Sequence, residues 1–115
     1  MDERWLKRTC RKWQKRLGLM DWTITAAFAP ITDLTEGCTA NISWEPDDMT
    51  AQMWVARPED ATDSSLYFIE SCVVHELGHL LFYGHIPIPE YDVNMERALN
   101  KMTGALMPKR KHCEQ

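Results

Sequence analysis

The sequence lacks the features of a membrane protein and of a secreted protein held by disulfides. No segment approaches the roughly 20 apolar residues that a membrane-spanning helix needs. The start of the chain, residues 1–8, is not followed by an apolar segment of the kind found in secretory signals. We therefore expect a cytoplasmic protein that makes no contact with a membrane.

The sequence also has no C-x-x-C pair, which argues against a zinc knuckle and against a thioredoxin-like redox site. Its four cysteines are far apart, at Cys10, Cys38, Cys72 and Cys113. Without a secretory signal, reduced and buried thiols are the better expectation.

Internal repeats, low-complexity tracts and linkers are absent as well. The 115 residues are 44% hydrophobic and include five tryptophans, which is enough for one core. We predict a single domain over residues 1–115.

Charge is unevenly distributed along the chain. Residues 1–18 contain seven Lys or Arg and two acidic residues, which gives this segment a net charge of +5. Because the whole chain has a net charge of −4, the remaining residues carry a net charge of −9. A basic helix face is either a solvated surface or a site of attraction for an acidic partner such as nucleic acid. The acidic balance of the whole chain favours the solvated face and leaves nucleic acid as the alternative.

Apolar periodicity predicts the secondary structure. Residues 3–17 show helical spacing and Gly18 can end that helix. Residues 22–28, 40–44 and 49–55 alternate with period two, which predicts three half-buried strands. The short connections favour a mostly antiparallel sheet.

Two further helices are predicted after the strands. Asp63 or Ser64 can cap one that runs to about Tyr83, and Pro89 suits the first turn of the last. The apolar residues expected to form the buried stripe of the last helix are Val93, Ala98, Leu99, Met102 and Leu106. The predicted fold class is α+β.

The pentapeptide His75-Glu76-Leu77-Gly78-His79 has the pattern H-E-x-x-H inside an apolar helical stretch. Residues four apart lie on one helix face, so both imidazoles can share one zinc ion. Glu76 then lies beside the metal, where it can accept a proton from water. The alternative is that both residues are ordinary helix histidines that bind no metal. The chain has only four histidines and these two lie in an apolar helix, which favours the metal site over this alternative.

A catalytic zinc needs a third protein ligand, and two candidates are open. Glu96 lies seventeen residues after His79, on a helix that the proline-rich turn would fold back against the first. His85 has the spacing of a three-histidine site, but Phe82 stands where such sites have glycine. We favour Glu96, with His112 a distant third, and Asn100 lies one turn later, where it can hydrogen-bond a ligand.

The chain resembles compact zincin-type metallopeptidases. The resemblance rests on the pentapeptide, on Glu96 with Asn100 on a following helix, and on Leu17-Gly18-Leu19 with Asp21-Trp22. It is similar to small zinc peptidases of phages and prophages, distant relatives of the SprT-like and ImmA/IrrE-like groups. The resemblance implies a minimal zincin-like domain, a phage origin in the host cytoplasm, zinc on His75, His79 and Glu96, and Glu76 as the general base.

Two functions are therefore expected. The first is a zinc metallopeptidase acting on a protein or peptide, with Tyr83, His85 or Tyr91 as candidates to stabilise the oxyanion. If residues 49–55 form the sheet edge beside the site, an extended peptide can add to it as a further strand. The alternative is a non-catalytic, zinc-stabilised binding or regulatory module, possibly nucleic-acid-associated, in which four ligands close the metal site.

Overall fold

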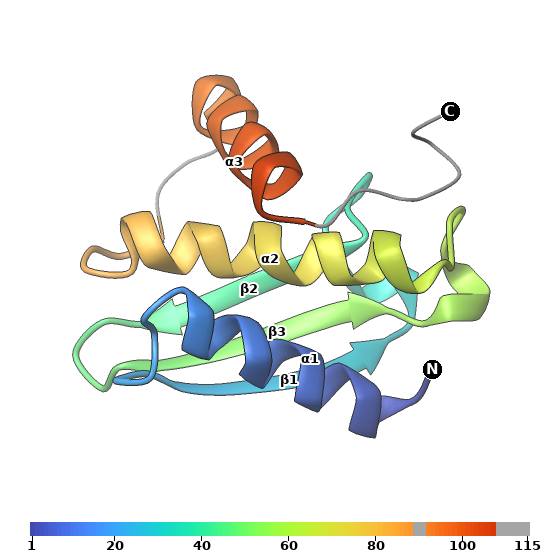
Figure 1. Ribbon diagram of the computed structural model, residues 1–115, viewed down its shortest axis with the longest axis horizontal. Coiled ribbons are helices and arrows are strands. Elements are labelled where there is room, and N and C mark those ends of the chain that lie inside the picture. The colour runs from blue at the N-terminus through green and yellow to red at the C-terminus, as the bar shows by residue number, and fades with distance from the viewer. Residues whose placement is uncertain (89–91, 108–115) are drawn as a thin grey trace.

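The computed structural model describes residues 1–88 and 92–107. These residues form an α+β fold of three α-helices and one three-stranded sheet, which confirms the predicted fold class (Figure 1). The elements in chain order are α1 (Glu3–Arg16), β1 (Thr23–Ala29), β2 (Ala40–Glu45), β3 (Thr50–Ala56), α2 (Leu66–Tyr83) and α3 (Val93–Leu106). Among the described helices, none has the length and apolar character to cross a membrane.

Helix α1 follows the predicted pattern. The side chain of Asp2 caps it by accepting a hydrogen bond from the Trp5 backbone N–H at 2.9 Å. Leu17 caps the other end, and Gly18 follows with a φ of +73°, a left-handed conformation that glycine adopts without strain. The face that carries Leu6 and Trp13 is buried against the rest of the core.

The sheet is mixed, so the prediction of a mostly antiparallel sheet is wrong. The strand order is β1-β3-β2, with β1 parallel to β3 and β2 antiparallel to β3. The tight turn between β2 and β3 enforces an antiparallel pair, but residues 30–39 are long enough to carry the chain past the position of β3. As a result β3 is central, and β2 is an edge strand.

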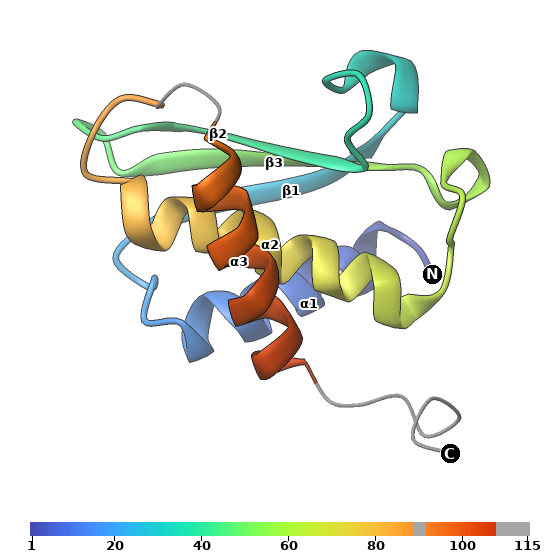
Figure 2. The same cartoon turned by 90° about the horizontal axis from the view of Figure 1, so that it is seen from above.

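One face of this sheet supports the helices. Ala26, Ile42 and Met53 lie in register on neighbouring strands and point to the same side, where Met53 is fully buried. Helices α1 and α2 pack on that side, and α3 crosses the outer surface of α2 (Figures 1 and 2). In the described part of the chain no helix covers the opposite face of the sheet.

Helix α2 is surrounded by apolar contacts. It packs against the sheet, α1 and α3, and Val73, Val74 and Leu77 are fully buried. Its N-cap is Ser65 rather than the predicted Asp63 or Ser64: the Ser65 hydroxyl accepts from the Phe68 backbone N–H.

The end of α2 depends on close packing and not on a left-handed turn. Gly84 caps it with a right-handed φ of −63°. A Cβ at Gly84 would lie 2.5 Å from the Leu80 carbonyl oxygen and 3.0 Å from the Trp22 ring, so only glycine fits there.

Helix α3 turns a different face inward from the one predicted. Met95, Leu99 and Thr103 are buried at spacings of four, whereas Val93 and Leu106 are exposed. The prediction of Leu99 is therefore confirmed and that of Val93, Ala98 and Leu106 is wrong. Asp92 caps the helix, and Pro89 lies outside the described residues.

Candidate metal centre

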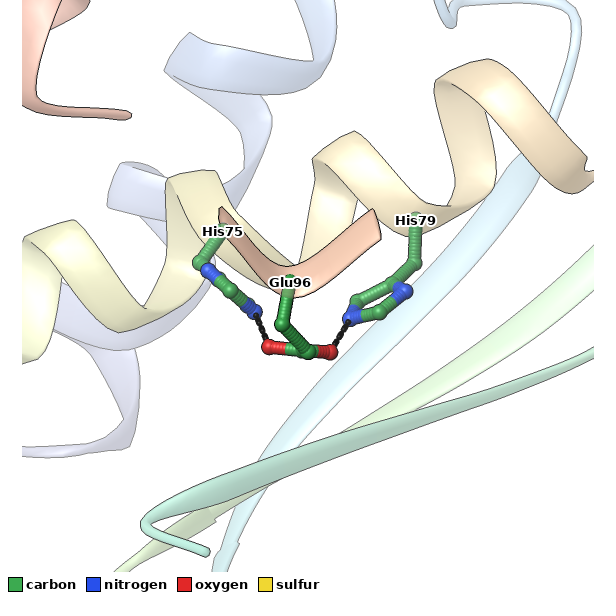
Figure 3. A group of neighbouring side chains, drawn as sticks. All are labelled: His75, His79 and Glu96. Atoms are coloured by element: carbon green, nitrogen blue, oxygen red, sulfur yellow. Dashed lines mark ion pairs between the residues drawn. The ribbon is translucent and has the colours of Figure 1, made fainter. Parts of the chain in front are cut away.

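Three side chains from two helices converge on one point. The Nε2 atom of His75 lies 2.9 Å from one carboxylate oxygen of Glu96, and the Nε2 atom of His79 lies 3.0 Å from the other. Figure 3 shows the Glu96 carboxylate between the two imidazoles. Among the described residues this is the one group of three His, Cys, Asp or Glu side chains whose ligand atoms lie within 4.8 Å of one another.

Local helix geometry brings the two histidines together. The four-residue spacing places them on the same face of α2, with ring centroids 5.1 Å apart. Both side chains are about 15% exposed, so they lie at the wall of a cavity and not on the open surface.

The approach of Glu96 depends on the packing of α3 against α2. A Cβ added to Gly78 would lie 2.8 Å from Leu99 and 2.8 Å from Met102, both on α3. Glycine inside the pentapeptide therefore lets the two helices come close. Because Leu99 is buried in this contact, Glu96 on the adjacent face of α3 points toward the histidines.

The three donors match the chemistry of zinc. Two imidazole nitrogens and one carboxylate oxygen are ligands that zinc accepts, with bonds of roughly 2.0–2.2 Å. Two atoms bound to one tetrahedral ion with such bonds lie roughly 3.3 Å apart. The observed separations of 2.9 and 3.0 Å are close to that spacing but run to different oxygens of Glu96, and one ligand atom from each of the three residues lies within 4.8 Å of the others.

Glu76 lies beside this group. Its carboxylate is 4.0 Å from the Nε2 atom of His75, and its side chain is 12% exposed. Burial, and secondarily the negative charge of Glu96, raise the pKa of Glu76 to about 8 in the metal-free protein. A cation in the site would favour the ionised form of both carboxylates.

Burial acts on His79 in the opposite sense. It lowers the pKa of His79 below the ordinary value of 6.5, although the neighbouring Glu96 works against that change. A neutral imidazole is the form that binds a metal, so the buried setting of His79 favours its role as a ligand.

A cavity of about 760 Å³ opens beside the three side chains. It lies between α2, α3 and the edge strand β2, whose residues Ala40–Trp44 form one wall. The indole N–H of Trp44 donates to the Ile86 carbonyl at 2.8 Å, which ties the segment after α2 to β2. None of the described lining residues is Lys or Arg, and the acidic residues of the wall are Glu76 and Glu96.

Not every candidate from the sequence lies at this site. Asn100 lines the cavity, but Tyr83 packs against the hydrophobic core. His85 is exposed and belongs neither to the group of three nor to the described cavity wall. Tyr91 and His112 lie outside the described residues.

Sequence reasoning overlooked two thiols in the cavity wall, Cys38 and Cys72. Burial and the charge of Glu76 raise the pKa of Cys72 to about 12, and the pKa of Cys38 is raised by the same causes. Both are therefore thiols at neutral pH in the metal-free protein, and a thiolate is the form that attacks or binds metal. Cys72 lies on α2, three residues before His75, so helical spacing could have placed it on the same face. Cys38 lies in the loop before β2, and nothing in the sequence spacing indicated its position.

The wall formed by β2 was also missed. Residues 49–55 were considered as the strand that an extended peptide could join if they formed the sheet edge, but they overlap β3, which is the central strand. Comparisons with protein-family models, with curated proteins and with solved structures find no match.

Proposed function

We propose that this protein is a zinc-dependent hydrolase of peptide bonds. The observation that carries the proposal is the convergence of His75, His79 and Glu96 next to a buried carboxylate, Glu76, on the wall of a cavity. A structural zinc site is normally closed by four protein ligands, and a catalytic one uses three. The described residues supply three.

The ion and the chain have separate tasks in this proposal. Zinc at this site would supply Lewis-acid chemistry, polarising a carbonyl and lowering the pKa of bound water to about 7. Glu76 accepts the proton of the attacking water and delivers it to the leaving amine. Its position, one residue after the ligand His75 and 4.0 Å from the ligand nitrogen, suits a base that does not itself bind the metal.

The cavity wall favours an extended peptide as substrate. In the described part of the chain, β2 pairs only with β3, so its other edge offers backbone N–H and C=O groups. Residues Ala40–Trp44 of this edge line the same cavity as His75 and His79. A peptide in strand conformation would pair with that edge and lie across the group of three. Asn100, one turn after Glu96, is placed to hydrogen-bond Glu96 or the substrate.

The alternative of a closed, non-catalytic zinc site has less support. It needs a fourth ligand, for example His85, and His85 lies outside the group of three. A hydroxamate probe separates the two functions, because it binds zinc only where a coordination position is open.

The test measures zinc content and cleavage of a fluorescent casein in three proteins purified without added metal. Wild type is expected to contain one zinc per chain and to cleave casein in a reaction that a hydroxamate inhibits. Glu96→Ala is expected to lose zinc and activity, whereas the matched variant His85→Ala keeps both. Zinc lost from His85→Ala and retained in Glu96→Ala would contradict the assignment. A zinc-loaded wild type that never cleaves peptides would remove the hydrolase proposal and leave a metal-binding module.

A further inference from the structure

From Lys7 to its last residue, Arg16, the exposed side of α1 carries only positive charge. Between residues 7 and 16, each position of this helix is either buried or a lysine or arginine. The exposed residues line one open surface hollow, and we call them the basic face: Lys7, Arg8, Arg11, Lys12, Lys15 and Arg16.

This charge is poorly neutralised by the protein itself. Over the described ranges, one ion pair reaches the basic face, between Lys12 and Glu70 at 2.6 Å. Lys12 and Arg16 also lie over the Trp13 ring, at 5.7 and 5.0 Å from its centroid. Lys7, Arg8, Arg11 and Lys15 have no carboxylate within ion-pair distance in the described structure.

A solvated helix face normally mixes charges of both signs. Like charges at spacings of three and four destabilise a helix, and only Lys15 and Arg16, in the last turn, are favoured by the helix dipole. The rows Lys7, Arg11, Lys15 and Arg8, Lys12, Arg16 repeat that spacing throughout. An external polyanion would relieve this repulsion.

We propose that the basic face binds the phosphate backbone of nucleic acid. The basic face runs from Lys7 to Arg16, which at 1.5 Å per residue gives a straight row of cations about 14 Å in length. Three arginines and three lysines in such a row suit a regular line of phosphates, which arginine can bind with two parallel hydrogen bonds.

Two other partners fit the face less well. A helix that binds a membrane surface inserts an apolar side, but Leu6, Cys10 and Trp13 of α1 are buried in the core. A protein interface has an apolar centre depleted in charge, and the basic face contains no exposed apolar side chain between residues 7 and 16. A purely cationic row is therefore best matched by phosphates.

The basic face and the candidate metal centre lie on different sides of α2. Helix α1 packs against β1 and α2, whereas the cavity lies between α2, α3 and β2 (Figure 2). Nucleic acid on α1 would therefore leave the cavity free. Binding through this face goes beyond the proposed hydrolase activity and does not depend on it.

The experiment measures binding of the full chain to a fluorescent 20-base-pair duplex of mixed sequence over 50–200 mM salt. The plot of log Kobs against log salt is expected to be linear, with a slope of about −0.9 for each phosphate neutralised. The triple variant K7Q/R11Q/K15Q is expected to bind at least tenfold more weakly at 50 mM salt and to reduce the slope by about 2 to 3. Circular dichroism checks that the triple variant retains its helices.

Matched controls separate the face from net charge and from the metal site. R57Q/R97Q/K101Q removes three exposed cations outside α1 and is expected to keep both affinity and slope. His79→Ala is expected to keep duplex binding even if zinc is lost.

Several results would overturn the proposal. They are an undetectable complex at 50 mM salt, an equal loss in both triple variants, and binding to anionic vesicles or poly-glutamate as tight as binding to the duplex. The last result would indicate a membrane surface or an acidic protein as the partner.

Discussion

At the scale of single residues, Glu76 combines burial with proximity to His75, a proposed metal ligand. A carboxylate that acts as the base is needed for the reaction but not for metal binding. We expect Glu76→Gln to keep one zinc per chain and to lower kcat by at least a hundredfold, since amide nitrogen and oxygen cannot take up the proton. Elemental analysis and casein cleavage on the same sample measure both quantities. Glu59→Gln, at an exposed position before α2, is the matched control.

The same residue makes the metal-free protein sensitive to pH. The folded pKa of Glu76 is about 8, above the ordinary value of 4.5, so between these values the folded state holds a proton that the unfolded state has lost. The free energy of unfolding therefore falls as pH rises across that window, by about 1.4 kcal/mol per pH unit at most. The lowered pKa of His79 acts in the opposite direction, but only below its ordinary value of 6.5.

Urea unfolding in the presence of a chelator, between pH 6.5 and 8, isolates the contribution of Glu76. Wild type is expected to lose stability as pH rises, and Glu76→Gln to lose clearly less. A wild-type profile that is flat, or that rises with pH, would show that the buried carboxyl is already ionised in the metal-free protein.

At the scale of elements, the contact between α2 and α3 determines where Glu96 lies. Gly78→Val would place side-chain atoms into Leu99 and Met102 and push α3 outward. We expect zinc affinity to fall at least tenfold, because Glu96 would move away from His75 and His79. A competition titration with a chromophoric chelator measures this change.

Gly104→Val is the control for this helix contact. It makes the same substitution on α3, where an added Cβ meets no atom within 4 Å. Both variants gain helix propensity relative to glycine, so propensity cannot explain a difference between them. Equal zinc affinity in the two variants would indicate that the α2–α3 spacing does not control the site.

At the scale of the whole molecule, zinc is expected to stabilise the fold. The ligands come from two helices whose relative position exists only in the folded state, so binding energy adds to folding energy. Free zinc at one hundred times its Kd adds about 2.7 kcal/mol, which corresponds to a rise in Tm of about 10 °C for a chain of this size. Calorimetry with zinc and with chelator measures the difference. His79→Ala is expected to show none.

The sequence by itself determined the features that depend on local periodicity. Helical spacing predicted the buried side of α1 and the common face of His75 and His79, and alternation predicted three strands. These predictions succeed because a residue's neighbours on a helix or strand follow from its position in the element.

Tertiary structure alone decided the contacts between elements. It placed β3 at the centre and β2 at the edge, and it turned Met95 and Thr103 of α3 inward in place of Val93 and Leu106. The same packing brought Glu96, and not His85, to the two histidines. Local spacing could not predict which of the two residues reaches the histidines, because the outcome depends on how closely α2 and α3 approach each other. Gly78 controls that approach through its contact with Leu99, and this contact exists only in the folded protein.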